Sequence, residues 1–135
     1  MSGAPPIICE TSRPYWDGLA AGQIRMQRCD DCQGWVFYPR AFCPACSSRA
    51  LTWTPVTGTP TLYSYTVAQV PVAKVFAYLG KPILAVVELA NGVRVPTRLV
   101  DVEPEAVTIG MALEPVFDGA TYDNATLLLF KPAGK

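Results

Sequence analysis

The chain has 135 residues, enough for one compact domain or for a small module beside a second one. Half of the residues are hydrophobic and 16% are charged, a composition that can bury a core and that excludes an intrinsically disordered chain. The formal net charge is zero, and residues 54–130 carry seven acidic side chains against four basic ones. The larger half therefore lacks the basic surface that a nucleic-acid-binding protein usually shows.

The first residues, up to about residue 11, predict an extended tail. They include neither the basic region nor the long apolar run of a secretory signal, and no segment of the chain is apolar for long enough to span a bilayer. We therefore expect a cytoplasmic protein. In that reducing compartment, paired cysteines are more often metal ligands than disulfides. Cys9 has no such pair and is expected to be a free thiol.

A short helix is predicted next. Ser12 suits the N-cap position, and Pro14 suits the first helical turn. Tyr15, Trp16 and Leu19 then fall on one face. Such a short helix is marginal alone, so this face must dock on something. The sequence leaves two alternatives open, which are the chain's own domain and a partner subunit.

Two C-x-x-C pairs follow, at Cys29–Cys32 and Cys43–Cys46, with ten residues between them. Two such turns facing each other offer four thiolates to one tetrahedral ion. Zinc prefers this arrangement at ~2.3 Å per Zn–S bond, although iron fits the same geometry. A closed four-sulfur shell leaves no open coordination position, so the site is expected to organise the fold rather than to do chemistry.

The segments around these pairs are typical of a zinc ribbon. Strands are expected at residues 24–28, 35–38 and 51–53. Gln33 and Ser47 stand at the turn positions where glycine is frequent, and Asp30 and Asp31 are expected to be exposed turn residues.

Residues 57–135 are predicted to form a five-stranded barrel. Asn91 and Gly92 between two β-rich runs give a strong hairpin signal, and residues 103–106 allow one helical turn. A long strand, a hairpin, a short helical connection and two further strands match the order of an OB-fold, with another small β-barrel or a sandwich as the alternative. The strands are expected at residues 61–70, 83–89, 93–99, 111–117 and 126–131.

The connection at residues 71–82 is long and apolar, as functional loops often are. It is either a flap folded on the barrel or a flap that covers a hydrophobic ligand or a partner surface, with Phe76 and Tyr78 as candidate contact residues. Lys74 and Lys81 flank the apolar segment, where they could meet phosphates or simply keep the surface soluble.

No motif for catalysis is present. The chain has no histidine, the usual general base near neutral pH. It also contains no nucleophile elbow, no P-loop and no dinucleotide-binding glycine motif. A stand-alone enzyme is therefore not expected.

Several short motifs occur together in a characteristic order. They are Pro14-Tyr15-Trp16-Asp17-Gly18-Leu19, Gln27-Arg28-Cys29-Asp30-Asp31-Cys32, Tyr38-Pro39-Arg40, Cys43-Pro44-Ala45-Cys46-Ser47-Ser48, Tyr63-Ser64-Tyr65-Thr66-Val67 and Ile109-Gly110-Met111. In this order the chain resembles, over nearly its whole length, the family of zinc-ribbon/OB-fold proteins associated with acyl-CoA metabolism, formerly a domain of unknown function.

The resemblance implies a mainly β fold with an N-terminal helical segment, a rubredoxin-like zinc ribbon and a C-terminal OB-fold. We expect these parts at residues 1–23, 24–56 and 57–135. It also implies that Cys29, Cys32, Cys43 and Cys46 bind zinc, and it supplies no catalytic residue. Family members are typically non-catalytic partners of thiolase-fold enzymes, and some relatives are fused to or bound by hydratases.

From this resemblance we expect a non-catalytic accessory subunit of an acyl-CoA thiolase or thiolase-fold aldolase complex, a hetero-oligomer of two plus two subunits. Tyr15, Trp16 and Leu19 would contact the partner, and the barrel loop would border the CoA thioester. Two alternatives remain open, which are a single-stranded nucleic-acid binder, since aromatic side chains on an OB-fold can stack on bases, and a stand-alone acyl-CoA binding protein.

Overall fold

A computed structural model describes residues 5–70 and 74–134, except for the side chains of Val75 and Phe76. The chain forms two compact units, which are considered one at a time. The ribbon unit comprises Ile7–Thr57, and the barrel unit comprises the chain from Gly58 onward together with the N-terminal residues up to Pro6. Within the described ranges, no helix is both long and apolar enough to cross a membrane.

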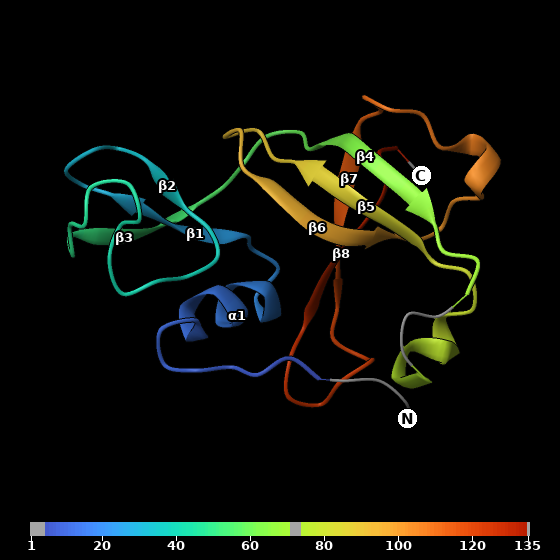
Figure 1. Cartoon of the computed structure of the whole chain (residues 1–135), viewed down its shortest axis with the longest axis horizontal. Coiled ribbons are helices and arrows are strands. Elements are labelled where there is room, and N and C mark those ends of the chain that lie inside the picture. The colour runs from blue at the N-terminus through green and yellow to red at the C-terminus, as the bar shows by residue number, and fades with distance from the viewer. Residues whose placement is uncertain (1–4, 71–73, 135) are drawn as a thin grey trace. The chain divides into compact units, whose positions relative to one another are not determined.

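The ribbon unit consists of one helix and a three-stranded antiparallel sheet. The helix α1 spans Arg13–Ala20, and it lies beside β1, Arg25–Cys29 (Figure 1). The short strand β2, Trp35–Val36, and the strand β3, Leu51–Pro55, pair with opposite edges of β1. The three strands expected around the cysteine pairs are therefore present. β1 is shifted by one residue, and β2 and β3 begin where expected but end two residues earlier and two residues later, respectively.

The helix α1 packs on its own unit. Tyr15 is 6% exposed and Leu19 is 1% exposed, whereas Trp16 is only partly buried. Close approach to the next segment depends on Gly18, because a Cβ atom there would lie 2.9 Å from the backbone oxygen of Gln23. Tyr15 and Leu19 thus pack on the chain's own unit. Trp16 remains partly accessible to a partner.

The N-cap of α1 is at Ser12, as expected, but the Ser12 side chain does not cap the helix. Its hydroxyl instead accepts a bond from the Cys9 backbone N–H at 3.1 Å and donates to the Cys9 carbonyl oxygen at 3.3 Å. Ser12 therefore closes the turn that leads into α1. The Cys9 side chain is exposed and forms no disulfide.

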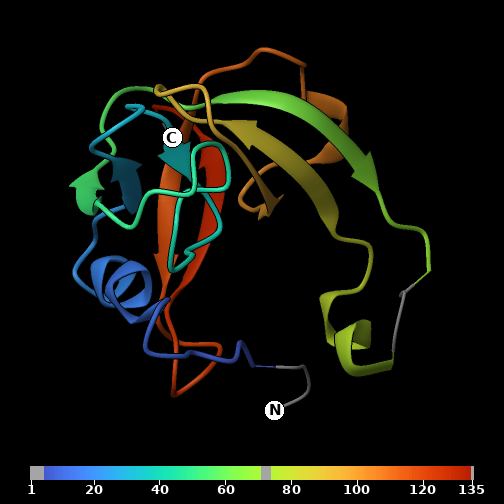
Figure 2. The same cartoon turned by 60° about the vertical axis from the view of Figure 1, so that its left-hand side comes forward.

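The barrel unit has the strand order β4-β5-β6-β8-β7 (Figures 1 and 2). Neighbours are antiparallel except β6 and β8, which are parallel. An isolated bridge between Thr61 and Ala112 joins the β4 and β7 ends of this order and closes the barrel. This is the topology of an OB-fold, so the predicted mainly β architecture with one short helix is confirmed. The strands are β4 Thr61–Val67, β5 Ile83–Glu88, β6 Arg94–Leu99, β7 Leu113–Asp118 and β8 Leu127–Pro132.

Alternation along the strands separates the barrel core from its outer face. Along β5 and β6, the paired residues Val87 and Val95 are both buried. The next pair, Glu88 and Arg94, forms a 3.0 Å ion pair on the outside. On β8, Phe130 is fully buried. The core contains the side chains of Leu62, Ile83, Ala85, Val87, Val95, Leu99, Leu113 and Phe130.

Two short helical turns occupy the connections of the barrel. The 3-10 turn η2, Pro104–Ala106, lies where the sequence allows one helical turn. The longer turn η1, Lys74–Leu79, lies in the connection between β4 and β5 (Figure 2). Residues 71–73 of that connection are outside the described part of the chain, so the flap predicted for residues 71–82 is described only from Lys74 onward.

Candidate zinc centre and protein-contact surfaces

The four paired cysteines meet at one point of the ribbon unit. Their Sγ atoms all lie within 4.8 Å of one another. The Sγ–Sγ distance is 3.5 Å between Cys29 and Cys46 and 3.7 Å between Cys32 and Cys43. A tetrahedral ion with Zn–S bonds of ~2.3 Å has sulfurs about 3.8 Å apart, whereas a disulfide needs ~2.05 Å. The donor set and its spacing therefore fit zinc and exclude a disulfide.

The two C-x-x-C turns, here called the knuckles, share one hydrogen-bond pattern. Cys29 accepts a bond at its carbonyl oxygen from the Gln33 N–H at 2.9 Å, and its own N–H donates to the Gly34 oxygen at 2.8 Å. In the second knuckle, Ser47 donates to the Cys43 oxygen at 2.8 Å and the Cys43 N–H donates to Ser48 at 2.8 Å. The same backbone turn is therefore built twice.

Each knuckle ends in a residue with left-handed backbone. Gln33 has a φ of 64° and Ser47 a φ of 65°. These are the two positions that the sequence identifies as departures from glycine. Because a side chain in this conformation is strained by roughly 1–2 kcal/mol, each knuckle carries a cost that another interaction must offset.

Hydrogen bonds favour the metal-binding form of one cysteine in each knuckle. The Cys32 N–H donates to Cys29 Sγ at 3.5 Å and lowers the pKa of Cys29 to about 7. The backbone N–H of Cys46 lowers the pKa of Cys43 in the same way. Because a thiolate is the metal ligand, both bonds prepare the site for a cation.

The exposed aspartates of the first knuckle are bonded to other parts of the ribbon. The Ser48 hydroxyl donates to the Asp31 carboxylate and so links the two knuckles. The Thr52 hydroxyl donates to Asp30 at 2.9 Å, which links the first knuckle to β3. Both acids are exposed, as expected, but they also brace the metal site.

An aromatic cluster, defined here as Tyr15, Trp16, Phe37 and Tyr38, lies between α1 and the segment after β2. The Tyr15 ring meets the other three edge-on, at centroid distances of 5.3 to 5.8 Å. Trp16 Nε1 donates to the Tyr38 hydroxyl at 2.9 Å. Tyr38 is 42% exposed, so Trp16 and Tyr38 form the accessible side of the cluster. Trp16 was a predicted contact residue, whereas Tyr38 was not.

The candidate residues of the barrel loop have different surroundings. Lys74 and Lys81 are exposed, and no ion pair involves them within the described chain. Tyr78 is 44% exposed, and its hydroxyl lies 3.3 Å from that of Tyr122 in the β7–β8 connection. The side chain of Phe76 lies outside the described part of the structure.

Comparisons with known proteins identify the family of both units. Residues 16–52 match the family described as the rubredoxin-like zinc ribbon domain of ChsH2, and residues 53–118 match that of the ChsH2 C-terminal OB-fold domain. A DUF35 domain-containing scaffold protein from Methanothermobacter thermautotrophicus is 35% identical over 113 residues, which cover 82% of this chain and 84% of that protein. The chain belongs to the DUF35 family. As a DUF35 protein with this ribbon, it takes zinc as its metal.

Other relatives of this DUF35 chain differ in length. A probable enoyl-CoA hydratase alpha subunit from Thermomonospora curvata is 32% identical over 95% of this chain, which spans only 39% of that protein. A DUF35 domain-containing scaffold protein from Methanocaldococcus jannaschii is 36% identical over 67% of this chain, which spans 64% of that protein. Because each of these alignments covers less than two thirds of the relative, the roles of these proteins do not transfer directly.

Solved structures resemble the whole DUF35 chain. A chain of the Ltp2-ChsH2(DUF35) aldolase matches with a TM-score of 0.83 and 29% identity, over 96% of this chain and 99% of that one. A DUF35 protein of unknown function from Sulfolobus solfataricus matches with a TM-score of 0.65 and 14% identity, over 91% of this chain and 85% of that one, which supports the fold alone.

Proposed function

We propose that this chain is a non-catalytic accessory subunit of a thiolase-fold enzyme, an aldolase or a thiolase that acts on CoA thioesters. The proposal rests on the match to a chain of the Ltp2-ChsH2(DUF35) aldolase, which covers nearly the full length of both chains. The scaffold names of two archaeal relatives point the same way. The bond-making chemistry would then occur on the partner.

The zinc centre would have a structural role. Cys29, Cys32, Cys43 and Cys46 would supply all four ligands, since their Sγ atoms form the one group among the described residues that lies close enough together. Bound zinc would add the cross-link that holds the two knuckles in one geometry. With four sulfurs around it, the ion has no position for a substrate or a water molecule.

The accessible side of the aromatic cluster is the contact surface that we assign to the partner. Trp16 and Tyr38 are partly exposed, and a hydrogen bond joins them. The buried Tyr15 ring packs edge-on against both of their rings. Rigid aromatic side chains of this kind are enriched where interfaces gain most of their binding energy. Phe76 and Tyr78 on the barrel loop would extend the contact, and Lys74 and Lys81 would face the phosphates of CoA.

Co-expression with a candidate thiolase-fold enzyme from the same organism tests the proposal. The two should elute together as a two-plus-two complex in size-exclusion chromatography with light scattering. Trp16→Ala should weaken the complex by at least about tenfold, in the range of an interface hot spot. Trp35→Ala is the matched control, because Trp35 stacks under Arg28, at 5.0 Å, and lies outside the aromatic cluster. Separate elution of two proteins, with the enzyme fully active alone, would exclude the role.

A hydratase is the second candidate partner. It is favoured by the Thermomonospora curvata relative, a probable enoyl-CoA hydratase alpha subunit that aligns with 95% of this chain. Co-purification with a hydratase subunit, and not with a thiolase-fold protein, would favour this alternative.

A further inference from the structure

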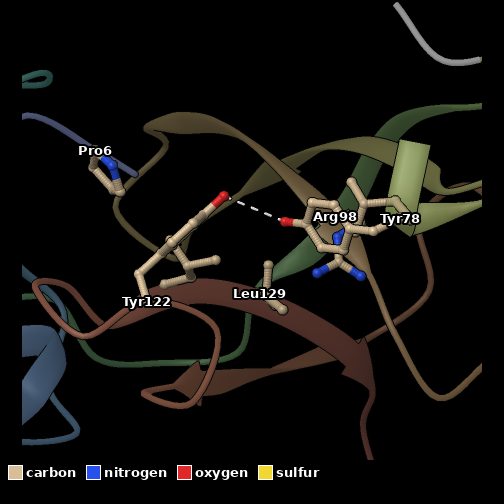
Figure 3. Close-up of a pocket in the computed structure, with 7 residues that line it drawn as sticks. Pro6, Tyr78, Arg98, Tyr122 and Leu129 are labelled. Atoms are coloured by element: carbon tan, nitrogen blue, oxygen red, sulfur yellow. Dashed lines mark hydrogen bonds between the residues drawn. The ribbon is translucent and has the colours of Figure 1, made fainter. Parts of the chain in front are cut away.

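A pocket lies on the outer face of the barrel unit, between two of its loops (Figure 3). The β4–β5 connection borders it on one side and the β7–β8 connection on the other. OB-folds generally bind their ligands between these two loops. The cavity holds about 330 Å³, at the lower end of the ~300–1,000 Å³ typical of ligand pockets. The lining residues are Pro6, Tyr78, Leu79, Arg98, Tyr122, Leu127 and Leu129.

The floor of this pocket is apolar although it lies outside the barrel. Phe130 is fully buried in the core, and alternation along β8 directs Leu129 and Leu127 to the opposite face. Leu129 is nevertheless only 8% exposed, because the pocket walls cover it. The β7–β8 loop that carries Tyr122 is tied to the N-terminal segment, since Asn124 Nδ2 donates to the Pro6 oxygen at 3.0 Å.

Three polar groups converge above this floor. The guanidinium of Arg98 lies at the pocket (Figure 3), and it makes no hydrogen bond or ion pair with any described residue. The hydroxyls of Tyr78 and Tyr122 are 3.3 Å apart, longer than the ~2.7–2.8 Å of a strong O–H···O bond. One of the two hydroxyl hydrogens lies in this contact, so the other one is left to donate to a further partner.

Two further observations describe the charge and protonation of these groups. The hydrogen bond with Tyr122 raises the pKa of Tyr78, so this phenol stays protonated at neutral pH. The Asp118 carboxylate accepts bonds from the Ala120 N–H at 2.9 Å and from the Thr121 hydroxyl. The Thr121 bond lowers the pKa of Asp118 most, and Arg98 lowers it to a smaller extent without forming an ion pair with it.

We propose that this pocket binds a small organic carboxylate with a compact apolar body. The apolar body would lie on Leu127 and Leu129, and the carboxylate would accept hydrogen bonds from Arg98 and from the one phenol whose hydrogen is not used between the two tyrosines. This site needs no partner subunit and thus goes beyond the proposed accessory role.

Ligand-observed NMR on the full zinc-loaded chain tests the proposal. Cyclohexanecarboxylate is the probe, and cyclohexylmethanol is the uncharged probe of matched shape. The carboxylate should bind saturably, and the alcohol should bind at least about tenfold more weakly, because it lacks the charge-assisted bonds. Arg98→Gln should weaken carboxylate binding by a similar factor. Arg94→Gln is the control, because Arg94 lies on the same strand and face but pairs with Glu88 at 3.0 Å.

Tyr122→Phe provides a second variant that removes only one hydroxyl, and it should weaken carboxylate binding severalfold. The proposal is overturned if carboxylate and alcohol bind equally, if neither binds saturably at millimolar concentrations, or if both pocket variants bind as the unchanged chain does. Failure here would leave the accessory role intact, because co-elution with a partner is measured without this ligand.

Discussion

Replacement of Cys43 by serine is expected to release the zinc and to unfold the ribbon unit. Cys43 is buried, and its Sγ lies 3.7 Å from that of Cys32. A serine hydroxyl is not ionised at neutral pH, so the variant would leave three thiolates at the site.

The expected size of the effect follows from how little else holds the knuckles. The apolar cluster beneath them consists of the two buried cysteines, Val36 and the partly buried Leu51. Burying two aliphatic side chains contributes about 3–6 kcal/mol, whereas a structural zinc ion contributes about 10–16 kcal/mol. Because the metal is the larger contribution by roughly twofold or more, its loss cannot be offset locally.

Zinc content and amide hydrogen exchange together provide the assay. Cys43→Ser should contain well under one zinc ion per chain, and the Gln33 and Ser47 N–H groups of the knuckles should lose protection. The Val100 N–H, bonded to the Phe130 oxygen at 2.8 Å inside the barrel unit, should keep its protection. Cys9→Ser is the matched control and should retain the metal, because Cys9 is exposed and outside the cluster. Full zinc content and unchanged protection in Cys43→Ser would refute the reasoning.

Three further predictions concern the ribbon unit. Ser47→Gly should stabilise it by about 1 kcal/mol, because glycine relieves the left-handed backbone there; a lower melting temperature would contradict this. Gly18→Ala should destabilise it in thermal melts although alanine favours helices, because the new methyl would lie 2.9 Å from the Gln23 oxygen. Burial, with a smaller effect of Tyr38, raises the pKa of Tyr15. The contribution of the neutral Tyr15 phenol to the free energy of unfolding is therefore complete below the unfolded tyrosine pKa of ~10 and is lost as the pH rises above it. Tyr15→Phe should therefore unfold less readily than the unchanged chain above pH ~10, and parallel stability curves would exclude this linkage.

The features that were predicted correctly from the sequence are those that depend on short-range sequence patterns. The cysteine spacing predicted the metal-binding cluster, and the absence of glycine at Gln33 and Ser47 marked the strained ends of both knuckles. The Asn91-Gly92 pair predicted the β5–β6 hairpin, in which Gly92 has a φ of 88°. Each of these features depends on residues that are close in the sequence, so it can be predicted without knowledge of the tertiary structure.

Features that depend on tertiary contacts could not be predicted. The sequence pattern of an amphipathic helix face, here at Tyr15 and Leu19, is the same whether the face packs inside its own unit or on a partner. The first barrel strand was expected to reach residue 70, but it ends at Val67, because its partner β5 begins only at Ile83. The pocket at Arg98 and Tyr122 was not predicted. The sequence feature that points to it is the unbroken apolar run from Leu127 to Phe130, because such a run is typical of a strand that is covered on both faces.

Closure of the barrel has a consequence for the order in which the chain can fold during synthesis. The bridge between Thr61 and Ala112 joins segments that are far apart along the chain, and β8 must be inserted between β6 and β7. The ribbon unit, in contrast, is complete once Thr57 has left the ribosome. Contacts between distant residues form slowly, and domains generally fold as units from the N-terminal end. The nascent chain is therefore expected to acquire its metal while the barrel strands are still unpaired, so zinc supply acts on the first folding step.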